Sequence, residues 1–258
     1  MLPHQSFTAR HHRSPGRQLS KPIAATEGRC RGDPANLAIY REDASPRTFS
    51  FEAEIAAIEE TAAIRGIDRF HLAGASAGGA IAAAYAAQHP EGLVSLTLME
   101  PAWLGGDMTE AERNAHSELE ALTALQDQEM LAKFVRVHLG PGVPTPPPRP
   151  GTPPPWMARG PVGIRAFIAA LARYDLDLAA LQRFNAPLLY ILGGLTNPAL
   201  YRQRAERARS LFPNFELRVF EHRHHFDPPY QAEPEILAGM LLTFWARAER
   251  QVSEATEI

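Results

Sequence analysis

The stretch from Phe70 to Met99 restricts the possible folds more than any other part of this chain. It contains two short apolar segments, 70–73 and 93–99, which flank a glycine-rich turn at 74–79 and an alanine-rich segment at 80–88. Two strands joined by a buried helix form a βαβ unit, in which the crossover makes the strands parallel. The sequence therefore predicts an α/β fold, with helices flanking a mostly parallel sheet.

Similar elements occur on both sides of this unit. An amphipathic helix is expected from Phe51 to Ile64, because its apolar residues follow a helical period, and Gly66 lies where a helix cap belongs. The other expected elements are a short strand at 37–40, strands at 187–192 and 215–220, and helices at 199–211 and 233–247. We assign residues 36–102 and 185–258 to this α/β core.

Residues 103–184 interrupt the alternation of strands and helices. Thr109 and Glu112 have the spacing of a capping box at the start of a helix, and a helical pattern continues with interruptions to about Leu139. A proline-rich connector follows at 141–155, and Pro161 can open another helix that runs to Arg173. We interpret this region as a helical cap over the carboxyl edge of the sheet.

The first 35 residues differ from the rest of the chain. They are rich in Arg, His, Ser, Pro and Gly and have neither strand nor helix periodicity, so we expect residues 1–35 to be poorly ordered.

Composition argues against several classes of protein. The net charge of −3 implies no general attraction to nucleic acid or to acidic membranes, and the single cysteine, Cys30, allows no internal disulfide. No apolar run is long enough to cross a bilayer, and the N-terminus lacks the apolar core of a signal peptide. We expect a cytoplasmic protein with no membrane or nucleic-acid partner.

The turn Gly74-Ala75-Ser76-Ala77-Gly78 matches the pattern G-x-S-x-G between a strand and a helix. A serine at such a tight turn projects its hydroxyl out of the sheet, and the helix N-terminus stabilises negative charge. Ser76 is therefore the predicted nucleophile, with the backbone N–H of Ala77 as one oxyanion-hole donor. The alternatives are a turn kept small for packing and a dinucleotide-binding turn, but the spacing does not fit G-x-G-x-x-G.

Three histidines, His222, His224 and His225, follow the last expected strand. A loop histidine at this point can reach across the sheet edge and take the serine proton. We choose His225, which directly precedes Phe226, and expect His222 and His224 to be exposed or in a supporting position. A metal site is the alternative, but no companion group of Cys or His has ligand spacing, so we expect no metal.

These motifs resemble those of the capped α/β-hydrolases. The segment 69–79 looks like their nucleophile elbow, 187–198 resembles the strand before their usual acid, and His225-Phe226 followed by Glu233-Pro234-Glu235 resembles their histidine loop and closing helix. The resemblance covers about residues 36–248 and includes the cap. It implies hydrolysis of an ester, a related acyl bond or a carbon–carbon bond in a small, apolar substrate, without a cofactor.

The sequence offers more than one candidate for the acid of the expected triad. Where the family usually carries Asp, this chain has Asn197, which can accept a hydrogen bond from histidine but cannot balance the charge of imidazolium. Glu100 ends the strand that follows the nucleophile helix, and some α/β-hydrolases draw their acid from that strand end. We therefore select Glu100, with Asn197 as the alternative and Asp227 as a weaker one because it lies so close to His225 in sequence.

The start of the chain also departs from the family pattern. Relatives begin with three further strands, which need about 45 residues and supply the second oxyanion donor. Residues 1–35 provide neither the length nor the pattern, so we expect these N-terminal strands to be missing. The alternatives to a working hydrolase are an inactive truncated hydrolase and a non-catalytic binding protein on the same fold, with a nucleotide-binding protein as a distant third. Three apolar residues are candidates to line a pocket under the cap, although core packing is the commoner role for any one of them: Trp103, Trp156 and Met157.

Overall fold

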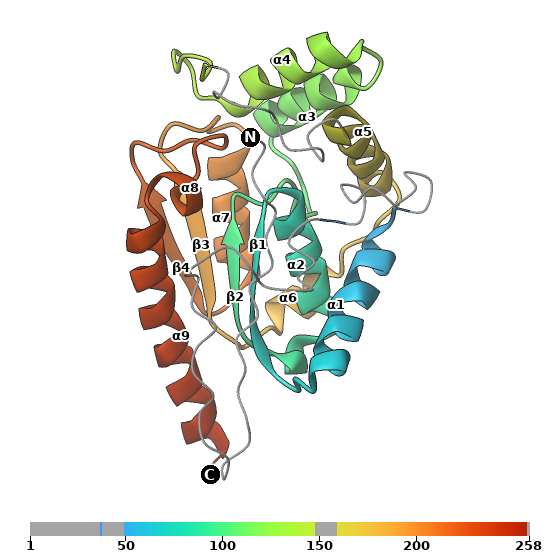
Figure 1. Ribbon diagram of the computed structural model, residues 1–258. Helices are drawn as coiled ribbons and strands as arrows, with labels where there is room; N and C mark the ends of the chain where they lie inside the picture. Colours follow the sequence, from blue (N-terminus) through green and yellow to red (C-terminus); the bar gives the residue numbers. More distant parts are fainter. Residues whose placement is uncertain (1–36, 38–48, 148–158, 257–258) are drawn as a thin grey trace.

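A computed structural model describes residue 37 and residues 49–147 and 159–256 (Figure 1). Within these residues, one sheet holds four parallel strands in the order β1-β2-β3-β4. The strands are β1 (Phe70–Ala75), β2 (Leu93–Met99), β3 (Leu188–Gly193) and β4 (Phe215–Phe220). The prediction of an α/β fold with a parallel sheet is confirmed. The predicted strand at 37–40 and the absence of N-terminal strands concern residues outside the described part, apart from Leu37, which is buried.

The register of the central strands aligns their carboxyl ends. Ala75 of β1 pairs with Met99 of β2, and Met99 pairs with Ile191 of β3. The residues that directly follow β1 and β2, Ser76 and Glu100, therefore leave the sheet side by side at one edge.

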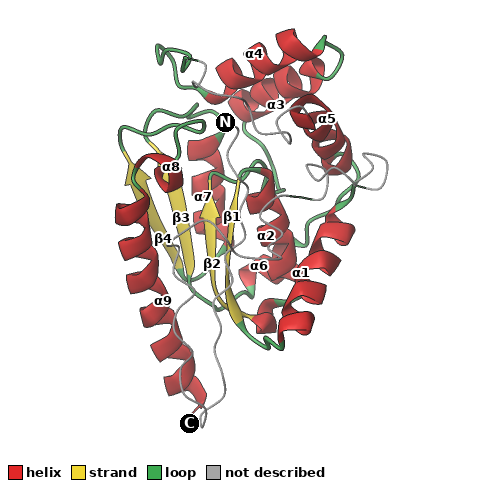
Figure 2. Ribbon diagram, in the orientation of Figure 1, coloured by secondary structure: helices red, strands yellow, loops and turns green. Residues whose placement is uncertain are grey.

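Helices cover both faces of the sheet (Figures 1 and 2). One face packs against α1 (Phe51–Arg65), α2 (Ala77–Gln88), α6 (Leu178–Gln182) and α7 (Tyr201–Leu211), in the larger hydrophobic core. The other face packs against α8 (Pro229–Ala232) and α9 (Pro234–Thr256) through Leu237, Phe244 and Trp245. A single 3-10 turn, η3 (Pro90–Gly92), connects α2 to β2.

Local sequence signals account for the bounds of α1. The Ser50 hydroxyl accepts a hydrogen bond from the N–H of Ala53 at 3.1 Å, which satisfies one of the free donors at the helix start. Gly66 ends the helix with a φ of 63°, a left-handed conformation that costs glycine little, and its N–H donates to the last turn. Both the helix and its glycine cap agree with the sequence-based prediction.

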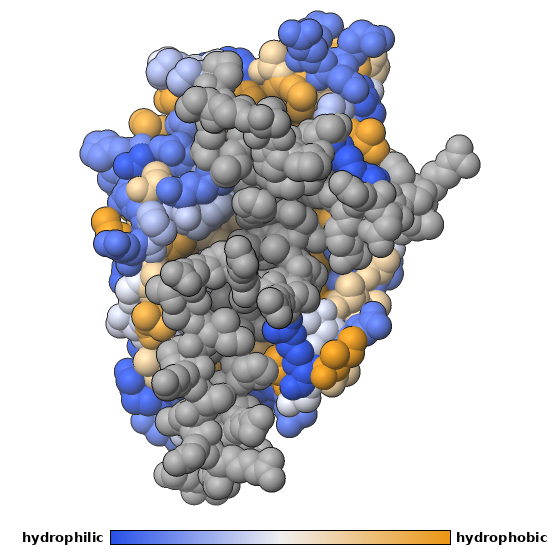
Figure 3. Space-filling model, in the orientation of Figure 1, coloured by the Kyte–Doolittle hydropathy of each residue, from blue (hydrophilic) through white to orange (hydrophobic). Residues whose placement is uncertain are grey.

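Three helices lie across the carboxyl ends of the strands: α3 (Glu110–Leu122), α4 (Asp127–His138) and α5 (Gly160–Leu171) (Figure 1). We refer to these three as the upper helices. The hydroxyl of Thr109 caps α3, as expected, by accepting from the N–H of Glu112 at 3.2 Å. On the face shown in Figure 3, hydrophilic residues lie beside hydrophobic ones over the upper helices. Both α3 and α4 bury only one side. Among the described helices, none is both long enough and apolar enough to cross a membrane.

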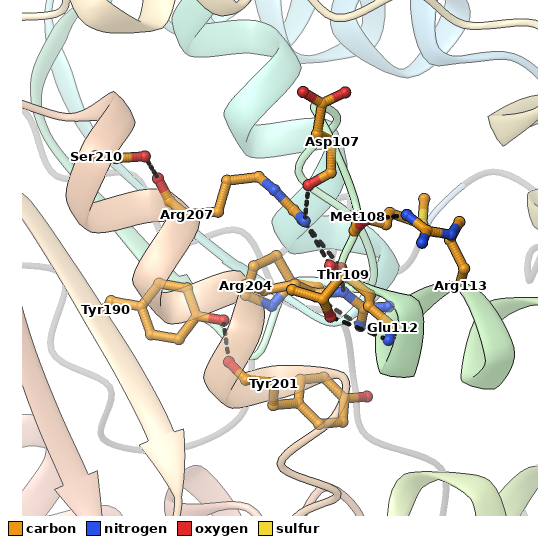
Figure 4. A network of polar contacts seen from close by, with 11 residues as sticks. Asp107, Met108, Thr109, Glu112, Arg113, Tyr190, Tyr201, Arg204, Arg207 and Ser210 are labelled. Atoms are coloured by element: carbon orange, nitrogen blue, oxygen red, sulfur yellow. Dashed lines mark hydrogen bonds and ion pairs between the residues drawn. The ribbon is translucent and has the colours of Figure 1, made fainter.

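A buried ionic network joins the upper helices to α7 (Figure 4). The carboxylate of Glu112 on α3 lies 3.5 Å from Nε of Arg204, and both side chains are only 1% exposed. Arg207 donates to the same carboxylate at 3.0 Å and to the carbonyl of Asp107 at 2.7 Å. Charges buried this deeply persist only when they are paired, so Glu112 ties α3 to α7.

We predict that Glu112→Ala will destabilise the protein far more than Thr109→Ala. The first change leaves the buried guanidinium of Arg204 without its carboxylate and is expected to cost about 3–5 kcal/mol, whereas losing the helix cap costs about 1 kcal/mol. Urea unfolding of the two variants measures the difference. Equal losses would show that the network contributes no more than the cap.

Candidate active site

Ser76 occupies a strained backbone position between β1 and α2. Its φ of 53° and ψ of −122° lie in a region that residues other than glycine rarely adopt. The surrounding backbone holds it there: its N–H donates to the carbonyl of Met99 at 3.0 Å, and its carbonyl accepts from the N–H of Ala102 at 2.8 Å. The turn therefore fixes the direction of the Ser76 side chain.

The small residues of the turn are required by close contacts. A Cβ atom at Gly74 would lie 2.3 Å from the carbonyl oxygen of Gly78, and one at Gly79 would lie 2.9 Å from Cα of Pro101. Gly74 thus allows β1 and α2 to pack closely around Ser76, which explains the first glycine of the G-x-S-x-G pattern. Gly79 allows α2 to approach Pro101.

The structure brings Ser76, His225 and Glu100 together in a hydrogen-bonded chain. The Ser76 Oγ lies 3.1 Å from Nε2 of His225, and Nδ1 of His225 lies 2.9 Å from Oε2 of Glu100. All three residues are less than 9% exposed. In its ionised form Glu100 only accepts hydrogen bonds, so Nδ1 then carries the proton toward it, which leaves Nε2 as the acceptor for the serine hydroxyl.

The backbone around Glu100 directs its carboxylate toward the histidine. Glu100 directly follows β2 with a φ of 45°, an uncommon conformation for glutamate. Its second oxygen, Oε1, accepts a hydrogen bond from the N–H of Gly193 at 2.7 Å. A Cβ at Gly193 would lie 2.5 Å from the carbonyl oxygen of Arg223 and 3.0 Å from Oε1 of Glu100, so only glycine fits at the end of β3.

Burial shifts the pKa values of both partners toward their neutral forms. It raises the pKa of the Glu100 carboxyl, although the hydrogen bond from Gly193 opposes the shift. Burial also lowers the pKa of His225, and the nearby positive charge of Arg204 acts in the same direction. His225 is therefore held as a neutral imidazole, the form that can accept a proton.

The other candidates near the histidine are engaged elsewhere. Asp227 pairs with Arg223 at 2.7 Å, and Nδ1 of His224 accepts from the N–H of Phe226 at 3.2 Å. His222 is exposed and His224 is half-buried.

Asn197, the alternative partner for His225, uses its side chain on two backbone groups. Its Nδ2 donates to the carbonyl of Val137 at 2.7 Å, and its Oδ1 accepts from the N–H of Ala199 at 3.0 Å. The geometry thus places Glu100, and not Asn197, against the imidazole.

Of the three apolar pocket candidates, only Trp103 lies in the described part of the chain. It packs edge-on against Phe51, with ring centroids 6.1 Å apart, beside the larger core. Trp156 and Met157 lie outside the described residues.

Two aromatic side chains that the sequence analysis missed contact the imidazole of His225. His138, at the end of α4, and Tyr201, at the start of α7, each stack on it with centroids 4.9 Å apart, at interplanar angles of 27° and 22°. Both are buried, and burial lowers the pKa of His138 well below its usual range. No motif spacing connects these positions with His225, because only the packing of α4 and α7 brings them together.

Ala77 begins α2, where the first backbone N–H groups of a helix have no partner inside the helix. Its N–H therefore lies at the helix end that favours negative charge. A small cavity of about 20 Å³, enough for one water molecule, touches Ser76, Glu100 and His225 and is also lined by Pro229 and Tyr230. In the described part of the chain, no cluster of three or more His, Cys, Asp or Glu side chains is placed to hold a metal ion.

The fold agrees with what comparison with known proteins shows. The chain belongs to the alpha/beta hydrolase family, whose family model matches residues 9–239. No match was found among proteins with curated descriptions.

Several solved structures share the fold at low sequence identity. A membrane phospholipase A, described as a bacterial virulence factor, is 23% identical with a TM-score of 0.60, and the match covers 83% of this chain and 69% of that one. A thermophilic esterase from Thermogutta terrifontis is 16% identical with a TM-score of 0.54, covering 78% and 73% of the two chains. A proline iminopeptidase from Mycobacterium smegmatis is 18% identical with a TM-score of 0.52, covering 81% and 76%.

We predict opposite effects for two glycine-to-alanine changes. Gly74→Ala should destabilise the protein by at least about 2 kcal/mol, because the new Cβ forces the tight turn apart. Gly239→Ala in α9 meets no atom within 4 Å, so it should stabilise the protein by about 0.5–1 kcal/mol. Thermal unfolding of both variants tests the pair, and a neutral Gly74→Ala would contradict the close approach of β1 and α2.

Proposed function

We propose that this protein is a serine hydrolase that cleaves an ester, a related acyl bond or a carbon–carbon bond through a covalent acyl-enzyme. The observation that carries the proposal is the unbroken hydrogen-bonded chain from Ser76 through His225 to Glu100. Nucleophile, base and buried acid meet at the end of a parallel sheet in a member of the alpha/beta hydrolase family.

In the first step, the Ser76 oxygen attacks the carbonyl carbon of the substrate while Nε2 of His225 takes the hydroxyl proton. The carbonyl oxygen becomes negatively charged, and the N–H of Ala77 stabilises it. His225 then gives its proton to the leaving group, the bond to that group breaks, and the acyl group remains on Ser76. Water next attacks the acyl group, losing a proton to His225, which returns that proton to Ser76 as the acid product leaves.

Glu100 stabilises the imidazolium each time His225 holds the extra proton. Because the carboxylate is buried and fixed by the N–H of Gly193, it also holds the imidazole with Nε2 toward the serine. The proposed steps use these side chains, the N–H of Ala77 and water, without a metal or cofactor.

We further propose a small substrate with an apolar acyl group and assign the upper helices, within residues 103–184, the role of a cap above Ser76. The structural neighbours include a phospholipase and an esterase. Of the three kinds of bond proposed, these neighbours favour an ester. The cytoplasm remains the expected location.

We predict that a fluorophosphonate probe labels the wild-type protein at Ser76, and that Ser76→Ala abolishes both labelling and hydrolysis of p-nitrophenyl esters. The change removes one oxygen and should leave the melting temperature nearly unchanged. Peptide mapping of the labelled protein identifies the modified residue. A wild-type protein that reacts with neither probe nor ester would favour the alternative, a non-catalytic binding protein on the same fold.

A second prediction separates the carboxylates near the histidine. Glu100→Gln should lower kcat by about 10³–10⁴-fold, because an amide cannot balance the charge of imidazolium. Asp227→Asn is the matched control, since this carboxylate pairs with Arg223, and its kcat should change less than about threefold. Steady-state kinetics on one ester measures kcat for both variants. A larger loss of kcat in Asp227→Asn than in Glu100→Gln would identify Asp227 as the acid.

A further inference from the structure

The loop after β3 holds the last turn of α4 through three hydrogen bonds. Besides its side-chain bond to the Val137 carbonyl at 2.7 Å, Asn197 donates its backbone N–H to the carbonyl of His138 at 3.0 Å. The N–H of Gly140 donates to the carbonyl of Leu195 at 2.9 Å. Because the last carbonyls of a helix have no partners within it, the two bonds from Asn197 satisfy free acceptors, and all three bonds fix the end of α4 to the core.

The residue fixed by these bonds, His138, contacts the histidine of the triad. Its side chain is 3% exposed and stacks on the His225 ring at 4.9 Å. Its orientation is set within α4, since Nδ1–H donates to the carbonyl of Phe134 at 2.6 Å. Phe134 and Phe226 enclose the same ring, at centroid distances of 4.2 Å and 5.7 Å from His138.

The imidazole of His225 can turn about its side-chain bonds unless neighbouring groups prevent it. Hydrogen bonds to Glu100 and Ser76 fix the two ring nitrogens, but bonds in the plane of the ring leave that plane free to tilt about the line that joins them. A flat side chain against the face of the ring removes this freedom. Tyr201 and His138 both supply such a contact, and only His138 belongs to the upper helices.

We propose that Asn197 and His138 are positioning residues through which the upper helices hold the imidazole of His225 in line with Ser76. Asn197 holds the end of α4, α4 carries His138, and the His138 ring fixes the plane of His225. This proposal rests on the proposed function, because it concerns the base of that reaction.

The test compares four variants. Asn197→Asp keeps the acceptor for the N–H of Ala199 but replaces the donor to Val137 by an oxygen that repels the carbonyl. His138→Ala removes the stacking ring, and His138→Phe keeps a flat ring in its place. Asn214→Asp is the matched control, because Asn214 donates to the carbonyl of Asn185 at 2.6 Å at the opposite edge of the sheet.

We expect Asn197→Asp and His138→Ala each to lower the rate of fluorophosphonate labelling at Ser76, and kcat on esters, by about 10–100-fold with little change in KM, since misplacing a reacting group costs about this much. His138→Phe should recover most of the rate, and Asn214→Asp should behave as wild type. The double variant Asn197→Asp/His138→Ala should be no slower than His138→Ala, because both changes break one connection. A wild-type rate in Asn197→Asp, additive losses, or a His138→Phe variant as slow as His138→Ala would overturn the proposal.

A readout independent of activity separates this proposal from the proposed function. In histidine-labelled protein, the NMR signals of the His225 ring should shift in His138→Ala and Asn197→Asp and stay in place in Asn214→Asp. If the wild-type protein proves unreactive while these signals shift as described, the hydrolase assignment fails and the positioning of His225 stands. Unmoved signals in Asn197→Asp overturn the positioning role whatever the activity.

Discussion

The hydrogen bond between Glu100 and His225 places the strongest demands on the rest of the structure. A buried carboxylate is tolerated only where each oxygen has a partner, and here His225 serves one oxygen and the N–H of Gly193 the other. Both partners depend on the parallel register, which ends β2 beside β1 and β3 at one edge of the sheet. The same register lets the N–H of Ser76 bond to the carbonyl of Met99, directly before Glu100. Nucleophile and acid are thus fixed by one set of backbone contacts.

The upper helices reach the same imidazole by two routes. One runs from Glu112 on α3 to Arg204, whose guanidinium lies 5.3 Å over the ring of Tyr201, and Tyr201 stacks on His225. The other runs through α4, whose last residue, His138, stacks on His225 directly. Arg204 also helps lower the pKa of His225, so Glu112 balances a charge that affects the base. Packing of these helices and electrostatics at the triad are therefore linked, and changes far from Ser76 can alter its reactivity.

Much of the core could be predicted because its signals are local. The strand at 93–99 and the helix beginning at Phe51 with its Gly66 cap agree with the structure almost residue for residue, since apolar periodicity and caps act over a few positions. The region 103–184 was harder to predict: one interrupted helix pattern proved to be two helices, α3 and α4. Glu112 has the spacing of a reciprocal capping box, yet its carboxylate turns to Arg204 and Arg207, because two arginines, of which Arg204 is buried, bind it more strongly than a backbone N–H does.

The sequence by itself determined the fold class, the turn that presents Ser76, and a short set of candidates for the other site residues. These follow from patterns within a few residues, such as glycines that permit a close turn or a polar residue at a strand end. Only the tertiary structure decided among Glu100, Asn197 and Asp227 as partner of His225, and only it brought His138 and Tyr201 onto that ring. Contacts between residues far apart in the chain depend on strand register and helix packing, and those are set by the burial of the whole core rather than by any local pattern.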